Sequence, residues 1–417
     1  MTLGGMDVLH LAWGLALFVV PGALWSRVLF RKMSLAGRVA LGFGLSLVAV
    51  TGTVLLLSLA VAVSGPVVYG VVALYGGIPL AWLLLRREMP RPEMPDRRTL
   101  LRLALLLGVL AFVMVMTHLP HLENGYGLPF HADEWVHWGY TRSFMESGGV
   151  DFANPFTGAE ESDNPEIGFH AFLGCFTWLS GASLQTVFVY LPALIAALTG
   201  LAAYVLGERS RRRYGLGAAF FVAFLPTTIR FLGPSFLVPV ALGLLLALLA
   251  LILAEATGAT RYPLLFALVL VAMVMHPPSA VALAVVLLCH AAVRPLDGRY
   301  REGGLLALVT LAPLALSYVI VPARFFQQGM GALFGETYVS NLSTISLELQ
   351  SMSVVAWGLF FLGAFLALWR GRALQRGLAV ATLAFLAVVL AYGEYGLGLP
   401  ILYDRVFLYL FLLVAVL

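Results

Sequence analysis

Long apolar runs separated by short polar segments make up most of the chain. A membrane-spanning helix needs about 20 largely apolar residues, within a range of about 17 to 25. Runs near this length lie at 8–26, 39–63, 66–85, 101–118, 184–206, 216–232, 235–254, 262–276, 279–293, 304–322, 352–369 and 377–392, with a shorter one at 406–417. The pattern predicts an all-α polytopic membrane protein with about 13 transmembrane helices. The short last run is either a stunted helix or, as we favour, part of a C-terminus truncated from a longer protein.

The composition agrees with this class. The 417 residues are 61% hydrophobic and only 11% charged, with a mean hydropathy of +0.95, whereas soluble domains carry about 25% charged residues. The net charge of +4 comes from short clusters. A soluble enzyme, a disordered chain and a nucleic-acid binder are therefore excluded. Cys175 and Cys289 lie in apolar runs and support neither a disulfide framework nor a thiolate metal site.

The positive charges predict the orientation, because cytoplasmic loops collect Arg and Lys. Residues 1–10 contain Asp7 and no basic residue, so they do not read as a cleavable signal. With the N-terminus outside, 21 of the 25 cations fall on the cytoplasmic side and 14 of the 21 acids on the other. The outward cations are Arg142, Arg230, Arg324 and Arg405. We expect a multi-pass protein of the plasma membrane whose working face is extracytoplasmic.

Two long polar segments, 119–167 and 323–351, fall on the external side. The first contains nine acids, and long ordered connections are usually functional. Three parts are therefore expected: transmembrane helices in 1–118, an acidic loop with juxtamembrane helices in 119–183, and a second transmembrane bundle in 184–417. No symmetric pair of interrupted helices, the sequence sign of many secondary transporters, is apparent.

Within the first loop, residues 131–146 predict a helix at the outer membrane surface. Helical spacing would stack Asp133 on His137 and Trp135 on Trp138, and tryptophans suit the headgroup region of a membrane. The apolar stretch 171–179 is too short to span and predicts a second interfacial or re-entrant helix.

These segments resemble the GT-C superfamily of membrane glycosyltransferases, which includes oligosaccharyltransferases, protein O-mannosyltransferases and lipid A aminoarabinose transferases. The matching residues are Asp133-Glu134-Trp-Val-His137, Asn164-Pro-Glu-Ile-Gly-Phe-His170 and a late Tyr403-Asp-Arg405. The resemblance implies a polyprenyl-phosphate sugar donor and an acidic base in the first long external loop. Three predicted helices precede the one that leads into this loop, where the superfamily usually has one. No Trp-Trp-Asp motif is present, which argues against an oligosaccharyltransferase proper.

Transfer of a sugar to a hydroxyl needs a carboxylate to take the proton and cations or a metal to hold phosphate charge. Asp133 and Glu134 are the candidate catalytic residues. Asp133 and His137 could hold a divalent metal, Mg²⁺ or Mn²⁺. The candidate substrate-binding residues are Arg405, His276, His170, Glu166, Asp163, Tyr403 and Arg324.

Each residue also has an ordinary structural interpretation. Acids favour the first turn of a helix, and acids beside a proline turn are commonly solvated. His276 could cap a helix end, and His170 could simply pack where the loop re-enters the membrane. Arg405 could pair with Asp404 at a helix start.

We expect an extracytoplasmic glycosyltransferase that uses a polyprenyl-phosphate-linked sugar. Its acceptor would be a lipid, protein or glycan, and its other partners would be membrane lipids. The alternatives are a lipid or polysaccharide transporter and a glycan polymerase or ligase of another fold. A transporter should place ionisable groups at mid-membrane, where the predicted spans leave almost none.

Overall fold

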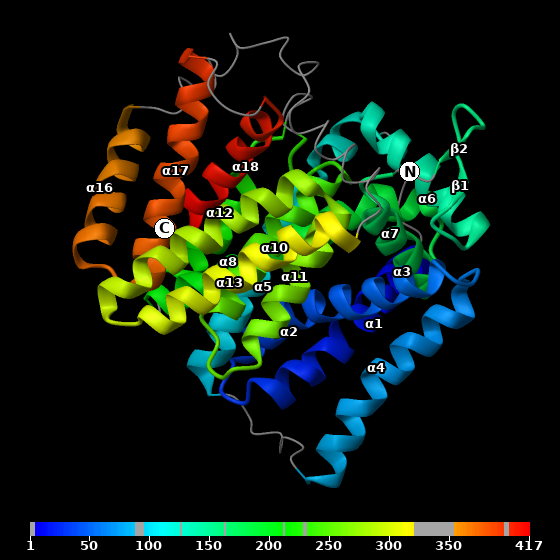
Figure 1. Ribbon diagram of the computed structural model, residues 1–417, viewed down its shortest axis with the longest axis horizontal. Coiled ribbons are helices and arrows are strands. Elements are labelled where there is room, and N and C mark those ends of the chain that lie inside the picture. The colour runs from blue at the N-terminus through cyan, green and yellow to red at the C-terminus, as the bar shows by residue number, and fades with distance from the viewer. Residues whose placement is uncertain are drawn as a thin grey trace.

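The computed structural model describes residues 5–87, 96–125, 127–161, 164–211, 213–227, 232–320, 354–395 and 400–417 (Figure 1). Over these residues the chain is helical apart from one hairpin, in which β1 (Phe152–Ala153) pairs antiparallel with β2 (Glu160–Glu161). The helices before the hairpin are α1 (Gly5–Leu29), α2 (Leu35–Ser46), α3 (Gly52–Ser58), α4 (Gly65–Leu85), α5 (Arg97–Asn124) and α6 (Ala132–Ser147). The helices after it are α7 (Ile167–Ser180), α8 (Leu184–Ser210), α9 (Gly215–Phe221), α10 (Pro239–Ala254), α11 (Arg261–Met275), α12 (Pro277–Val293), α13 (Tyr300–Ile320), α16 (Val354–Arg370), α17 (Ala373–Tyr395) and α18 (Pro400–Val416).

The helical membrane class predicted from the sequence is confirmed. Seven helical stretches of the described residues are long and apolar enough to cross a membrane. They are Met6–Leu29, Leu35–Ser58, Gly65–Leu85, Arg97–Asn124, Leu184–Ser210, Pro277–Asp297 and Ala373–Tyr392. The second of these joins α2 and α3 through the π-helical segment Leu47–Thr51. The external segment predicted at 323–351 lies outside the described residues.

A helix lies over each of the 13 predicted apolar runs, with two clear differences in length. The run at 216–232 is helical only as far as Phe224. Leu225 is extended because Pro226 follows it, and a residue before proline is disfavoured in the α conformation. The last helix begins at Pro400, six residues before the predicted run, since proline suits the first turn of a helix.

The core of the bundle is α10, whose 16 residues are all buried. Helices α2, α8, α11, α12 and α18 surround it, and Figure 1 shows it near the middle of the molecule. A helix that is apolar on every side can be stable only when it is enclosed. The composition of α10, almost entirely Leu, Ala and Val, therefore dictates its central position.

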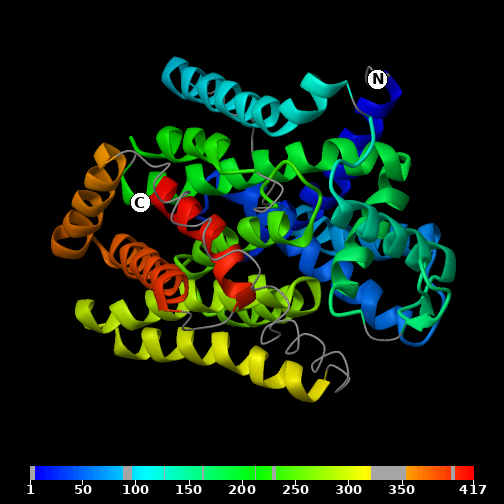
Figure 2. The same ribbon diagram turned by 90° about the horizontal axis from the view of Figure 1, so that it is seen from above.

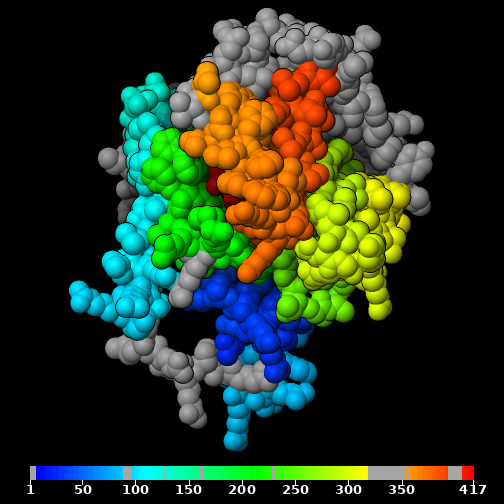
Figure 3. Space-filling model, turned by 90° about the vertical axis from the view of Figure 1, so that its left-hand side faces the viewer, coloured from blue at the N-terminus to red at the C-terminus, as the bar shows by residue number. Residues whose placement is uncertain are grey.

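Peripheral helices expose apolar side chains, as contact with lipid requires. Figure 2 places α5 at the margin, where it packs on α8 and α9. Figure 3 shows α16 beside α17 on another face of the molecule. The side chains of Phe361, Phe365 and Trp369 of α16 are 50–59% exposed. An exposed apolar surface of this kind is stable in a bilayer rather than in water.

The acidic loop folds into α6, the hairpin and α7, which positions the candidate site. Trp135 and Trp138 stack as their spacing predicts, with ring centroids 5.5 Å apart. Helix α7 differs from the interfacial alternative, because 13 of its 14 residues are buried. It packs against α1, α6 and α11, so its apolar side chains contact protein on almost every side.

The backbones of α1 and α2 cross closely at Gly22 and Gly42. A Cβ at Gly42 would lie 2.7 Å from the backbone nitrogen of Ala23 and 2.8 Å from the carbonyl oxygen of Val19. Small residues allow helices in membranes to approach in this way. The N–H of Gly22 also donates to Ser46 Oγ at 3.0 Å.

The crossing predicts that Gly42→Ala destabilises the protein, because rigid backbone atoms would have to move. We expect a lower midpoint of thermal unfolding in detergent. Gly108→Ala is the control, since no atom lies within 4 Å of a Cβ at that position and alanine favours a helix by up to about 1 kcal/mol. Equal midpoints for the two variants would contradict the close crossing.

Candidate functional site

Helix α6 begins at a capping box that ties three segments together. His131 Nδ1 accepts the N–H of Asp133 at 3.1 Å. The carboxylate of Glu134 accepts the N–H groups of Phe130 and His131 at 2.9 and 3.1 Å. Its other oxygen accepts the N–H of Leu237, just before α10, at 2.8 Å. Glu134 thus joins the acidic loop to the start of the central helix.

Glu134 is fully buried. Burial raises the pKa of its carboxyl group, and the three backbone hydrogen bonds oppose this shift only in part. A side chain that holds three backbone groups and has no exposed surface suits a structural role. Its predicted catalytic role stays a prediction.

Three histidines and a glutamate from α6, α7 and α12 meet near the start of α6. We call His137, His170, His276 and Glu166 the histidine–glutamate cluster. His137 Nδ1 and His170 Nε2 are 3.0 Å apart. Glu166 places one oxygen 3.8 Å from His137 Nδ1 and the other 3.6 Å from His276 Nε2. The histidines are buried, whereas the Glu166 side chain is 25% exposed.

Asn164 determines which ring nitrogen of His170 carries the proton. Its Oδ1 accepts the N–H of Glu166 at 2.9 Å, so its Nδ2 is the atom that faces His170 Nδ1 at 3.0 Å. His170 Nδ1 therefore accepts, and its Nε2 carries the proton that points at His137 Nδ1. This assignment gives neutral rings for both histidines, and it follows from the hydrogen-bond pattern.

His276 caps a helix, as one of the two interpretations of its sequence position predicts, and its substrate-binding role stays a prediction. As the N-cap of α12, its Nδ1 accepts the N–H of Ser279 at 3.3 Å and lies 2.5 Å from Ser279 Oγ. The proton of the neutral ring is then on Nε2, which faces Glu166. Capping thus orients the histidine toward the carboxylate.

Asp133 is the accessible acid beside the cluster. Its side chain is 46% exposed, and it lies one turn before His137 on the same side of α6. Its Oδ1 lies 3.8 Å from His131 Nδ1, the atom that accepts the Asp133 N–H. The exposed carboxylate of Asp133 is therefore accessible to a substrate.

The middle of α18 lies beside the start of α12. A Cβ on Gly243 of α10 would overlap both Ser279 Oγ and the hydroxyl of Tyr409. Ser279 is in the first turn of α12, and Tyr409 is one turn after Arg405. Arg405 is therefore one turn of α18 away from a residue that approaches the start of α12.

The structure brings together most of the residues predicted from the sequence. His137, His170, Glu166 and His276 form one cluster, with Asp133 and Glu134 at the same end of α6. The side chains of Tyr403 and Arg405 lie outside the described part, as do Asp163 and Arg324 entirely.

Sequence reasoning missed Asn164, Ser279 and Tyr140. Tyr140 stacks on His170 with ring centroids 5.3 Å apart. Two local signals could have been used: the Asn-Pro-Glu turn at 164–166, and the spacing of Ser279 after the capping His276. Tyr140 gives no such signal, because its contact depends on how α6 meets α7.

In the described ranges, no group of three or more His, Cys, Asp or Glu side chains is arranged to hold a metal ion. The predicted pairing of Asp133 and His137 on Mg²⁺ or Mn²⁺ stays a prediction.

No protein-family model and no curated protein matches the chain.

The raised pKa of Glu134 predicts a pH-dependent stability. The folded protein holds the Glu134 proton more tightly than the unfolded chain does. The stability from this group is therefore fully present below the ordinary pKa of 4.5 and is lost as pH rises through the raised value. We expect the free energy of unfolding of the wild type to fall over this window relative to that of Glu134→Gln.

Unfolding at a series of pH values tests this expectation. The exposed Glu123→Gln is the control and should keep the pH dependence of the wild type. If Glu134→Gln also keeps it, the pH dependence comes from another group.

Proposed function

We propose that the protein is a GT-C-like membrane glycosyltransferase that moves a sugar from a polyprenyl-phosphate donor to a hydroxyl acceptor on the extracytoplasmic side. One observation carries the proposal: an exposed carboxylate, Asp133, lies one turn of α6 from His137 of the buried histidine–glutamate cluster. The distribution of Arg and Lys along the chain predicts that this end of the bundle is extracytoplasmic.

The reaction divides into steps that these residues suit. Asp133 accepts the proton of the acceptor hydroxyl as the hydroxyl oxygen attacks the anomeric carbon of the sugar. The bond from that carbon to the phosphate oxygen breaks, and its electron pair leaves with the lipid phosphate. A new glycosidic bond joins sugar and acceptor, and the proton remains on Asp133 until water removes it.

Arg405 is our candidate for binding the donor phosphate. The guanidinium group offers a planar fork of N–H donors that matches phosphate oxygens. Arg405 is one turn of α18 before Tyr409, whose hydroxyl approaches Ser279 in the first turn of α12. Helix α18 packs on α8, α9, α10, α12 and α17, which would hold the fork in a fixed place.

The histidine–glutamate cluster would position Asp133 and receive protons from it. The rings of His170 and His276 are neutral, and their accepting nitrogens bind Asn164 and Ser279, so a proton could reach either nitrogen only when that hydrogen bond rearranges. Glu166 is the exposed member and is the alternative base. A divalent metal bound with Asp133 and His137 would supply further charge for the phosphate.

A transporter of lipid or polysaccharide is the second candidate. Three buried histidines around one carboxylate favour it, because ionisable groups at membrane depth often relay protons. A glycan polymerase or ligase of another fold stays a third alternative, with external arginines as its main feature.

The Asp133→Asn variant tests the enzymatic proposal. Asparagine keeps the shape of the side chain but cannot take the proton, so turnover should fall by about 10² to 10⁴ while donor binding persists. The assay follows release of the lipid phosphate from a polyprenyl-phosphate sugar by purified protein in liposomes. Glu146→Gln is the control, since Glu146 is an exposed acid of the same helix that pairs with Arg142.

Two outcomes would contradict the enzyme. One is wild-type protein that turns over no such donor while a labelled solute crosses the liposome membrane. The other is equal turnover in the wild type and in Asp133→Asn.

The Arg405→Lys variant tests the phosphate site. Lysine keeps the charge but loses the fork, so transfer should fall without loss of folding. Arg142→Lys is the control, because Arg142 is exposed and pairs with Glu146 on α6. Unchanged kinetics in both Arg405→Lys and Arg405→Ala would move the phosphate site to another outward arginine.

A further inference from the structure

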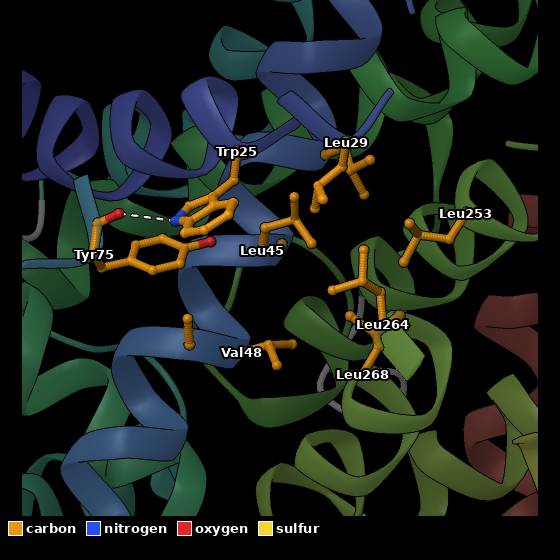
Figure 4. Close-up of a pocket in the computed structure, with 11 residues that line it drawn as sticks. Trp25, Leu29, Leu45, Val48, Tyr75, Leu253, Leu264 and Leu268 are labelled. Carbon is orange, nitrogen blue, oxygen red and sulfur yellow. Dashed lines mark hydrogen bonds between the residues drawn. The ribbon is translucent and has the colours of Figure 1, made fainter. Parts of the chain in front are cut away.

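An apolar cavity of about 250 Å³ lies between α1, α2, α4, α10 and α11, at the end of the bundle opposite to the candidate site. Figure 4 shows Trp25 and Tyr75 on one side and Leu264 and Leu268 on the other. An apolar cavity of about 150 Å³ is enough to bind benzene. This cavity therefore has room for a segment of a hydrocarbon chain.

Few polar groups line the cavity wall, and the indole N–H among them is bonded within the protein. The indole N–H of Trp25 donates to the carbonyl oxygen of Tyr75 at 2.8 Å, and the two rings stack with centroids 5.9 Å apart. The remaining lining is mostly Leu and Val. Water would find few partners in such a cavity, whereas a hydrocarbon chain would make van der Waals contacts with it.

A basic segment borders the cavity. Residues 27–38 contain Arg27, Arg31, Lys32 and Arg38 and no acid. Arg31 and Lys32 are exposed, and Arg27 and Arg38 are half-buried. Arg38 Nη2 donates to the carbonyl oxygen of Arg31 at 2.9 Å, which holds the guanidinium over the α1–α2 connection. The charge of Arg27 also acts on Arg38.

The cavity and the basic segment adjoin on α2. Leu41 lines the cavity and follows Arg38 at the i+3 spacing, on the same side of α2. Leu29, the last residue of α1, also lines the cavity and belongs to the basic segment. A molecule with an apolar chain in the cavity would thus present its head to the cations.

We propose that this place binds an anionic phospholipid of the inner leaflet, with one acyl chain in the cavity and the phosphate at Arg27 and Arg38. Charge complementarity selects the occupant: four cations within twelve residues suit a phosphate, and the lining suits a hydrocarbon chain. The distribution of Arg and Lys along the chain predicts that this end faces the cytoplasm, where the leaflet carries anionic lipid. The site is separate from the proposed catalytic site at the outer end.

The lipid would stabilise the lower part of the molecule. Helix α4 contacts α1, α3 and α7 and exposes Leu74, Ile78 and Leu85, and Figure 1 shows its later part diverging from the bundle. An acyl chain between Tyr75 and α11 would fill the space between α4 and the central helices. Filling it adds contacts that the empty cavity lacks.

The experiment uses the full chain purified in detergent. Retention of added phosphatidylglycerol is measured by native mass spectrometry, with phosphatidylcholine and a polyprenyl phosphate as competitors. We expect phosphatidylglycerol to be retained over phosphatidylcholine and to raise the midpoint of thermal unfolding. A site shared with the donor would instead release phosphatidylglycerol to the polyprenyl phosphate, which would overturn the proposal.

Two variants address the two parts of the lipid. The double variant Arg27→Gln/Arg38→Gln should weaken phosphatidylglycerol binding by about tenfold or more, because charge-assisted hydrogen bonds are lost. Ala49→Phe puts a ring into the cavity and should weaken binding of long-chain phosphatidylglycerol while the protein stays folded. The control is Arg370→Gln/Arg372→Gln, which removes two exposed cations elsewhere at the cytoplasmic end.

The comparison is decisive even if one variant folds poorly. Wild-type protein that retains phosphatidylglycerol and phosphatidylcholine equally contradicts the site without any mutation. Equal loss of phosphatidylglycerol in the control and in Arg27→Gln/Arg38→Gln would show general attraction to basic surface and would also overturn the proposal. None of these outcomes depends on glycosyl transfer, so failure here is distinct from failure of the proposed function.

Discussion

The carboxylate of Glu134 holds together the end of the protein at which α6 begins, which the charge pattern predicts to be the outer end. It accepts N–H groups from Phe130 and His131 at the start of α6 and from Leu237 before α10. Without this acceptor the buried N–H of Leu237 would lose a hydrogen bond, at about 1–3 kcal/mol, and the two partly buried N–H groups would lose theirs as well. The same contact sets where α6 lies against the central helix. Since α6 carries Asp133 and His137, the geometry of the candidate site depends on this one side chain.

At the opposite end of the bundle, predicted to be the inner one, ion pairs provide partners for buried charged groups. Glu255, at the end of α10, pairs with His290 at 2.8 Å and with Arg294. Burial alone would raise the pKa of Glu255, but the His290 hydrogen bond and the nearby cations outweigh burial and lower it to about 2. Arg261 and Glu302 form a second pair. Removing one partner would leave a buried charge unpaired, so this network fixes how α10 to α13 meet.

The sequence predicts those features that depend on short spacing. Apolar runs locate the helices, and the spacing of Trp135 and Trp138 predicts their stack. The helix predicted at 216–232 was too long, because hydropathy alone does not show that the residue before Pro226 leaves the helical conformation. The approach of Glu166 to His276 could not be predicted, since it depends on how α7 packs on α11 and where α12 begins. Each residue could be marked as chemically capable, but their meeting is a property of the packing.

The two ends use their charged groups differently, and the end at which α6 begins is the one whose acids are suited to meet a substrate. At the inner end Glu255 and Glu302 are both paired with arginines, and such pairs are expensive to break. At the outer end the buried rings of the cluster are neutral, while Asp133 and Glu166 keep exposed fractions of 46% and 25%. A group that takes a proton from a substrate must reach that substrate and must have an accepting atom to spare. Among the described acids beside buried histidines, Asp133 and Glu166 meet the first condition, whereas Glu134, with three backbone donors on its oxygens, serves to hold them in place.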